Sequence, residues 1–184
     1  CEKLTQASMS GVTFIGAHAF ENTSLSSLTL NDNIQTIGKY AFANTLLTGE
    51  NGVLTIPAGV TTIGEGAYSG LASVKSFAIG DNEKYFVESG MLYQRVPNGV
   101  QLIAFPAGSD GDNGKVELNA QTVRLGASAF ENAKKIESVE FPYVFKSIGD
   151  RAFFGSSAET YIFGCLTAPV LETQVLYAED FEAG

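Results

Sequence analysis

The sequence contains few of the residues from which catalytic and metal sites are usually built. It has a single histidine, His18, and only two cysteines, Cys1 and Cys165, among 184 residues. A nucleophile–base pair of the Ser–His or Cys–His kind therefore has no candidate. Two isolated cysteines also make neither a disulfide framework nor a metal-ligand cluster. We predict a protein that is not an enzyme and that needs no cofactor and no metal.

Positive charge and long apolar runs are scarce as well. Lys and Arg total 11 against 20 Asp and Glu, which gives a net charge of −9. A surface this acidic repels phosphate backbones, so we expect no nucleic-acid partner. No apolar run approaches the roughly 18 residues of a membrane-spanning helix, so we expect no membrane insertion. With 45% hydrophobic residues, the chain can still bury the core of one folded domain.

One six-residue pattern, Ile-Gly-x-x-Ala-Phe, occurs five times along the chain. The copies begin at Ile15, Ile37, Ile63, Leu125 and Ile148. Most steps cover 22 to 26 residues, within the range of about 20–29 residues for leucine-rich repeats. Such a period predicts a solenoid, in which each coil buries its apolar face against its neighbours. We expect the motif phenylalanines to stack from coil to coil as an aromatic spine.

A second pattern, a short apolar-x-apolar triplet, runs in phase with the first. Its alternation predicts a brief strand in each coil, with the two outer side chains in the core and the middle one in solvent. The last triplet residue precedes the next six-residue motif by seven residues in four coils. The four pairs are Leu30 and Ile37, Ile56 and Ile63, Leu118 and Leu125, and Phe141 and Ile148.

The period is interrupted between residues 80 and 124, where the six-residue motif does not occur. Two apolar runs on either side of Asn98-Gly99 predict a β-hairpin that turns at these two residues. We interpret 80–124 as a modified coil with an added hairpin, inside a single solenoid of residues 1–184. A shorter insertion at residues 45–52 lengthens one loop.

These patterns resemble the BspA-like leucine-rich repeats of bacterial cell-surface proteins. The match is clearest in Ile56-Pro57-Ala58-Gly59-Val60-Thr61-Thr62-Ile63-Gly64, and Gly90 to Gly108 is similar to a hairpin coil often found in that family. The resemblance covers nearly the whole chain. It implies a right-handed, mainly β solenoid, with short parallel strands on one face and turns and short helical segments on the other. It also implies a secreted or cell-surface protein, often of host-associated bacteria, with a role in adhesion.

Two features qualify the resemblance. The family often carries a cysteine shortly after Ala-Phe, where this chain has Asn22, Asn44 and Asn132. The segment from Cys1 to Leu4 matches the end of a preceding repeat, so we interpret Cys1 as the cut edge of a longer array. A lipid anchor at Cys1 is the alternative.

The middle residues of the triplets are the candidate ligand-facing positions, because repeat solenoids commonly bind through extended faces. We expect one ladder across the sheet, made of Thr29, Thr55, Ala78, Ala104, Glu117, Glu140 and Ile162. A merely solvated sheet is the alternative for any single one of them.

Three local patterns have simpler interpretations than a functional site. His18 occupies a variable position of the repeat and is expected on the surface. The segment Asp110-Gly111-Asp112-Asn113-Gly114 resembles the start of a calcium loop, but Gln121 stands where that loop needs glutamate, which predicts a solvated turn. Asn22-Thr23-Ser24 is formally a glycosylation sequon, and a hydrogen-bonded loop is the alternative.

The leading functional hypothesis is a non-catalytic adhesion module that recognises a host or extracellular protein or glycan. A structural spacer that presents another domain of a larger surface protein is the second hypothesis. A carbohydrate-active enzyme is the third; it would need a pair of facing carboxylates, which no pattern singles out.

Overall fold

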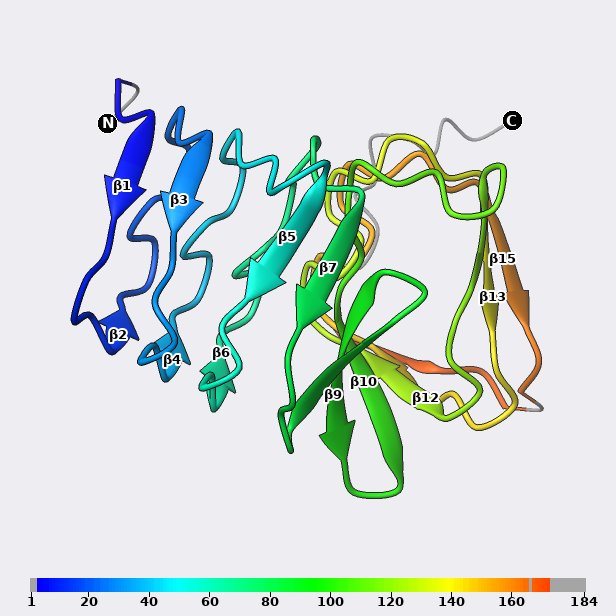
Figure 1. Ribbon diagram of the computed structural model, residues 1–184. Helices are drawn as coiled ribbons and strands as arrows, with labels where there is room; N and C mark the ends of the chain where they lie inside the picture. Colours follow the sequence, from blue (N-terminus) through cyan, green and yellow to red (C-terminus); the bar gives the residue numbers. More distant parts are fainter. Residues whose placement is uncertain (1–2, 166, 173–184) are drawn as a thin grey trace.

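The computed structural model describes residues 3–165 and 167–172, which form a mainly β solenoid of about seven turns (Figure 1). Each regular coil has three sides, which we call the long-strand wall, the short-strand wall and the turn wall. The turn wall carries the Ala-Phe part of the repeat. Cys1, with both interpretations of it, lies outside the described residues.

The N-terminal half contains four coils. Its long-strand wall consists of β1 (Gln6–Ser8), β3 (Ser27–Thr29), β5 (Val53–Ile56) and β7 (Ser76–Ile79). Its short-strand wall consists of β2 (Phe14–Ile15), β4 (Thr36–Ile37) and β6 (Thr62–Ile63). The short strands are parallel, with Ile15, Ile37 and Ile63 in register and all buried. The motif isoleucine therefore has the core-covering position that the repeat predicts.

The C-terminal half repeats this plan after a three-stranded antiparallel insertion. The insertion consists of β8 (Tyr85–Glu88), β9 (Met91–Val96) and β10 (Gly99–Ala104). The long-strand wall then consists of β11 (Lys115–Glu117), β13 (Ser138–Phe141) and β15 (Thr160–Phe163). The short-strand wall consists of β12 (Thr122–Leu125), β14 (Ser147–Ile148) and β16 (Val170–Leu171). The hairpin is confirmed, but its turn lies at Pro97 and Asn98, because Gly99 already pairs with Val96. β8 adds a third strand that was not predicted from the sequence.

The turn wall contains no helix in the described part of the chain, so the expectation of short helical segments is wrong. Each turn includes two residues in the left-handed region, four positions apart, with φ between 51° and 67°. The first of each pair is His18, Tyr40, Gly66, Ser128 or Arg151, and the second is Asn22, Asn44, Gly70, Asn132 or Gly155. A left-handed residue cannot continue a right-handed helix, so each segment forms a turn instead. No helix long and apolar enough to span a bilayer occurs among the described residues.

The aromatic side chains stack in two series rather than in one spine. In the N-terminal half, the Phe20, Phe42 and Tyr68 rings follow one another at centroid distances of 5.6 and 5.7 Å. In the C-terminal half, Phe130 stacks between Phe105 and Phe153 at 4.9 and 5.0 Å. The buried residues correspondingly form two clusters, one in each half.

The turn wall nevertheless continues across the interruption. The Gly70 amide donates a hydrogen bond to the Glu131 carbonyl (3.2 Å), and the Tyr40 and Ser128 hydroxyls lie 3.0 Å apart. The third and fourth copies of the repeat motif are therefore neighbours in space, and the inserted strands leave the stack between them (Figure 1).

Candidate functional site

The predicted ladder of outward residues is divided among three separate sheets. Thr29 pairs with Ser8, and Thr55 pairs with Ala78. The third group comprises Glu117, Glu140 and Ile162, which are aligned and exposed. The single ladder expected from the sequence is thus wrong, although most of its members do lie at the surface.

Ala104 is the member that the sequence placed on the wrong side. It is buried in β10, a strand that pairs with β9 and β12 and not with the long-strand wall. Burial in β10 alternates through Val100, Leu102 and Ala104, one residue out of phase with the triplet that contains Ala104. A shift of one residue exchanges the two faces of a strand, which explains the error.

The long-strand wall is interrupted between β3 and β5. β3 pairs with β1, β5 pairs with β7, and no strand pairing joins β3 to β5 within the described residues. At regular steps the residue after one strand donates to the next coil, as Met9 does to Thr29 (3.4 Å) and Leu118 to Glu140 (3.3 Å). The equivalent bond here would join the Leu30 amide to the Thr55 carbonyl, and it is not formed.

The loop insertion at residues 45–52 explains the interruption. It ends in a tight turn in which Glu50 and Val53 exchange two backbone hydrogen bonds of 3.0 and 2.9 Å. Gly49, Asn51 and Gly52 have positive φ angles of 65°, 54° and 86°, which glycine and asparagine tolerate best. A Cβ at Gly49 would lie 2.0 Å from the Val53 carbonyl oxygen, so the turn requires glycine there. Because the amide and carbonyl of Val53 are already bonded to Glu50, they cannot bond to β3.

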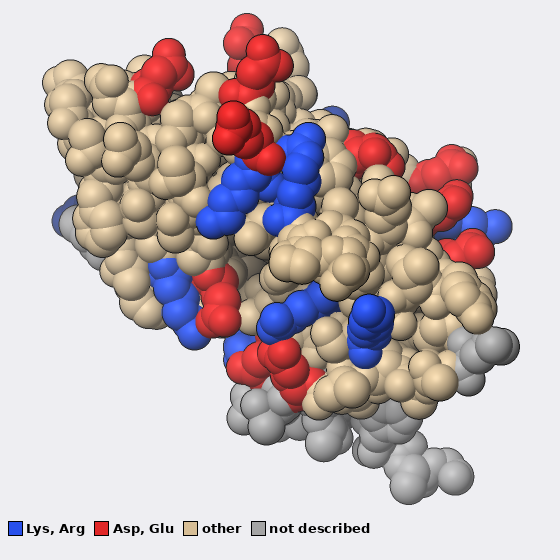
Figure 2. Space-filling view, turned by 90° about the horizontal axis from the view of Figure 1, so that it is seen from below, with Lys and Arg blue, Asp and Glu red and all other residues tan. Residues whose placement is uncertain are grey.

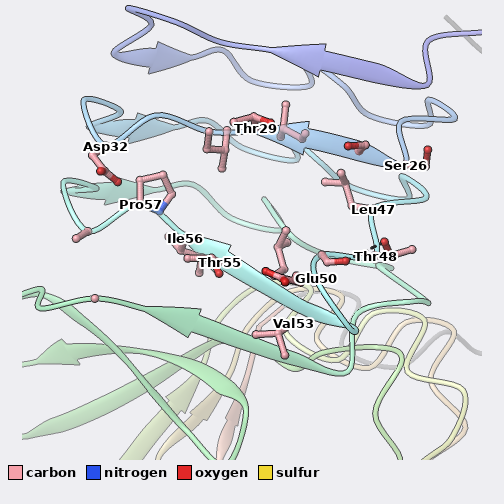
Figure 3. Close-up of a pocket in the computed structure, with 17 residues that line it drawn as sticks. Ser26, Thr29, Asp32, Leu47, Thr48, Glu50, Val53, Thr55, Ile56 and Pro57 are labelled. Atoms are coloured by element: carbon pink, nitrogen blue, oxygen red, sulfur yellow. Dashed lines mark hydrogen bonds between the residues drawn. The ribbon is translucent and has the colours of Figure 1, made fainter.

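A cleft of about 650 Å³ occupies the place of the missing strand pairing. Figure 3 shows it between β3 and β5, with Thr29 and Thr55 on facing strands, Asp32 at one end and Glu50 nearer the middle. Its apolar lining includes the half-buried side chain of Leu28 and the buried side chain of Leu47. We call this space the β3–β5 cleft.

The other two walls stay closed beside the β3–β5 cleft. On the short-strand wall, the amides of Thr61 and Thr62 donate to the Gln35 carbonyl at 2.8 and 3.1 Å. On the turn wall, the Phe42 amide donates to the Ala67 carbonyl at 2.9 Å. The coils therefore separate on one side only, and the opening is a built feature of an otherwise continuous stack.

The lining of the β3–β5 cleft is partly polar and partly aliphatic. Its 17 lining residues include hydroxyl side chains, aliphatic side chains and the carboxylates of Asp32 and Glu50, but no His, Cys, Lys or Arg. No nucleophile–base pair can be assembled from this set. Across the described residues, no group of three His, Cys, Asp or Glu side chains is arranged to hold a metal ion.

The other local patterns of the sequence lie away from this cleft. His18 is exposed as expected; its Nδ1 lies 2.6 Å from the Glu21 carboxylate, and its ring stacks on Tyr40. The segment 110–114 is an exposed turn in which Asp112 and Lys115 exchange backbone hydrogen bonds of 2.8 and 3.0 Å. It is the same turn as the one from Gly49 to Val53.

Charge does not gather on the face shown in Figure 2. Lys and Arg side chains lie beside Asp and Glu there, with uncharged surface between them. In one ion pair of the protein, the Lys39 ammonium lies 2.8 Å from the Glu65 carboxylate; this hydrogen bond raises the pKa of Lys39, although partial burial opposes it. A face of this kind offers no continuous basic track for a phosphate backbone.

Comparison with known proteins identifies the repeat. The family model described as "BspA type Leucine rich repeat region (6 copies)" matches residues 1–96 and 110–171. The chain belongs to the BspA-type leucine-rich repeat family. The two matched segments leave out residues 97–109, which contain the turn and second strand of the hairpin. No curated protein matches the sequence.

Solved structures show the same solenoid. A leucine rich cell surface protein from Faecalibacterium prausnitzii A2-165 has a TM-score of 0.79 and 29% identity, over 89% of this chain and 42% of its own. The pneumococcal vaccine antigen PcpA has a TM-score of 0.74 and 24% identity, over 88% and 40%. A leucine-rich repeat protein from Eubacterium ventriosum ATCC 27560 has 0.65 and 20%, over 88% and 54%. The chain thus spans about half or less of each of these proteins.

The sequence contained one signal for the β3–β5 cleft that motif counting did not use. Gly49-Glu50-Asn51-Gly52 and Gly111-Asp112-Asn113-Gly114 share the pattern Gly-acid-Asn-Gly directly before a strand triplet. Both copies form the same two-bond turn, and each precedes the first strand of a new sheet. The pattern therefore marks the places where the long-strand wall starts afresh.

Proposed function

We propose that this chain is a non-catalytic binding module of a cell-surface protein, and that it recognises an extracellular partner through its long-strand wall. The observation that carries the proposal is the β3–β5 cleft, an opening of about 650 Å³ between two coils that stay joined on their other two walls. Its volume lies within the range of about 300–1,000 Å³ that is usual for ligand pockets. Its lining offers hydrogen-bonding and apolar groups and includes no His, Cys, Lys or Arg.

The comparisons support the surface location. The F. prausnitzii relative is described as a leucine rich cell surface protein, and this chain belongs to the BspA-type leucine-rich repeat family. Adhesion to a host protein or glycan is the finer part of the proposal. It rests on the exposed walls that stacked repeats present, since extended surfaces of this kind are common binding sites in solenoids.

A binding screen of the purified chain against extracellular-matrix proteins and glycans at physiological salt tests the proposal. We expect at least one saturable interaction. The double variant Glu117→Lys with Glu140→Lys then tests the exposed face of β11 and β13: weaker binding would place the ligand there, and unchanged affinity would exclude that face. Absence of any saturable interaction would favour the structural spacer.

A further inference from the structure

The strand edges on both sides of the β3–β5 cleft carry free backbone groups. On β3, the Ser27 amide donates to the Thr5 carbonyl (3.2 Å), and the Thr29 carbonyl accepts from Met9 (3.4 Å). Ser27 and Thr29 therefore face β1. Because successive residues of a strand direct their backbone groups to opposite sides, the Leu28 amide and carbonyl face the cleft.

The opposite edge has the same property. The Gly52 carbonyl accepts from Ser76 (3.2 Å), so that Gly52, Leu54 and Ile56 face β7 while Val53 and Thr55 face the cleft. Val53 is already bonded to Glu50. The amide and carbonyl of Thr55 have no backbone partner within the described residues.

We propose that the β3–β5 cleft binds an extended peptide segment of a partner protein, which enters between Leu28 and Thr55 as an added β-strand. This inference rests on the proposed binding function and names its ligand class. Two facing edges can satisfy both sides of the added strand, whereas a strand added at a sheet edge is satisfied on one side only. A glycan would leave these backbone groups without the regular ladder that their spacing offers.

The lining also indicates which peptide fits. On β5 the open edge runs only from Leu54 to Pro57, roughly 13 Å at about 3.3 Å per residue, because Glu50 occupies the edge of Val53. Pro57 lacks an amide hydrogen and ends the open edge of β5. Asp32 lies at one end of the cleft and Glu50 lies nearer its middle, and no Lys or Arg lines it. We therefore expect a strand of about four residues, with an apolar side chain over Leu28 and basic residues beside the two carboxylates.

Thr55→Pro tests the proposal directly. Proline removes the amide that faces the cleft and fills part of the slot, while no hydrogen bond of the fold is lost, because this amide has none. Thr55→Ala is the matched control, since it removes the hydroxyl and keeps the amide. Glu117→Pro changes the equivalent residue after the second Gly-acid-Asn-Gly turn, and its thermal midpoint reports what proline alone costs the fold.

The probe is a display library of random heptapeptides, selected on the unmodified chain. We expect enriched peptides with alternating apolar residues and at least one basic residue. Thr55→Ala should retain their affinity, and Thr55→Pro should weaken it roughly tenfold or more. If no peptide is enriched, or if the enriched peptides bind Thr55→Pro as well as the unmodified chain, the proposal is wrong. Loss of binding in Thr55→Ala as well would indicate recognition through the hydroxyl, and would also overturn it.

Amide hydrogen exchange on the unmodified chain gives a second readout, which needs no variant to fold. Bound peptide should protect the amides of Leu28 and Thr55, both of which should exchange rapidly in the free protein. Unchanged exchange at both amides in the complex would contradict the added strand. A matrix protein or glycan that binds Thr55→Pro normally would refute the peptide strand while leaving the wider binding function in place.

Discussion

The two halves of the solenoid begin a long-strand sheet with the same turn, and the β3–β5 cleft lies beside the turn of the N-terminal half. Before β5 and before β11, a Gly-acid-Asn-Gly segment closes on itself through two backbone hydrogen bonds. In the N-terminal half, β3 already lies across from the new sheet, so an interrupted pairing becomes a slot with two edges. Before β11, the inserted strands β8, β9 and β10 come between β7 and the new sheet in the chain. What lies across from the turn, rather than the turn itself, decides whether a binding-sized opening results.

The inserted strands also separate the two core clusters, and they contribute buried side chains to both. Tyr85 and Leu92 belong to the N-terminal cluster, and Met91 and Tyr93 belong to the C-terminal one. The Tyr85 hydroxyl accepts a hydrogen bond from the Ile63 amide (2.9 Å), where β6 has no further neighbour. The insertion therefore ends one short-strand sheet and begins the next.

The largest expected effect concerns whether the two halves unfold together. Phe42 and Phe130 are fully buried, each between two aromatic rings of its own half. Replacing either by alanine should lower the free energy of unfolding by about 3–5 kcal/mol. Because the turn wall crosses the junction through Gly70 and Glu131, we expect a single transition for both variants in urea, followed by circular dichroism and tyrosine fluorescence. Two transitions in Phe42→Ala would show that the halves are independent.

A smaller effect is expected from Tyr93, at the boundary of the C-terminal core. Burial raises the pKa of Tyr93 to about 12, although a hydrogen bond from the Asn119 amide opposes the shift. A raised folded-state pKa favours the neutral phenol, so its contribution is fully present below about pH 10 and is lost as the pH rises toward 12. The free energy of unfolding should fall across this interval by an amount on the order of 2–3 kcal/mol for Tyr93. Thermal midpoints measured across the interval should fall accordingly.

Two variants separate Tyr93 from the other tyrosines. Tyr93→Phe should flatten this alkaline loss, and it should cost about 1–3 kcal/mol at neutral pH, because the Asn119 amide loses its acceptor. Tyr143→Phe is the control, since Tyr143 is 66% exposed and should change neither value. An unchanged alkaline slope in Tyr93→Phe would assign the loss to another group. Tyr68 is the first alternative, because complete burial raises its pKa as well.

The sequence predicted the coils better than the contacts between them. In-phase triplets and motifs identify the strands because burial within one coil has a simple period. Pairing between coils depends on where a neighbouring loop ends, so the β3–β5 cleft and the three separate groups of outward residues were beyond motif reading. The turn wall was mistaken for partly helical because residues such as Tyr40 and Ser128 have left-handed backbones without being glycine. Ala104 was misplaced because the hairpin register differs by one residue from the coil register.

The smallest expected effect compares the two Gly-acid-Asn-Gly turns directly. Asn51 and Asn113 occupy equivalent positions with φ angles of 54° and 50°, a region that asparagine tolerates better than alanine. Alanine at either position should therefore lower the free energy of unfolding by roughly 0.5–1 kcal/mol. Asn113→Ala should cost slightly more, because the Asn113 side chain also donates to the Asp112 carboxylate at 3.0 Å. Paired urea titrations of the two variants measure the difference.

If Asn51→Ala were without effect while Asn113→Ala destabilised the chain, the two turns would not be energetically equivalent. The cleft would then depend on the rest of the 45–52 insertion rather than on the turn that ends it.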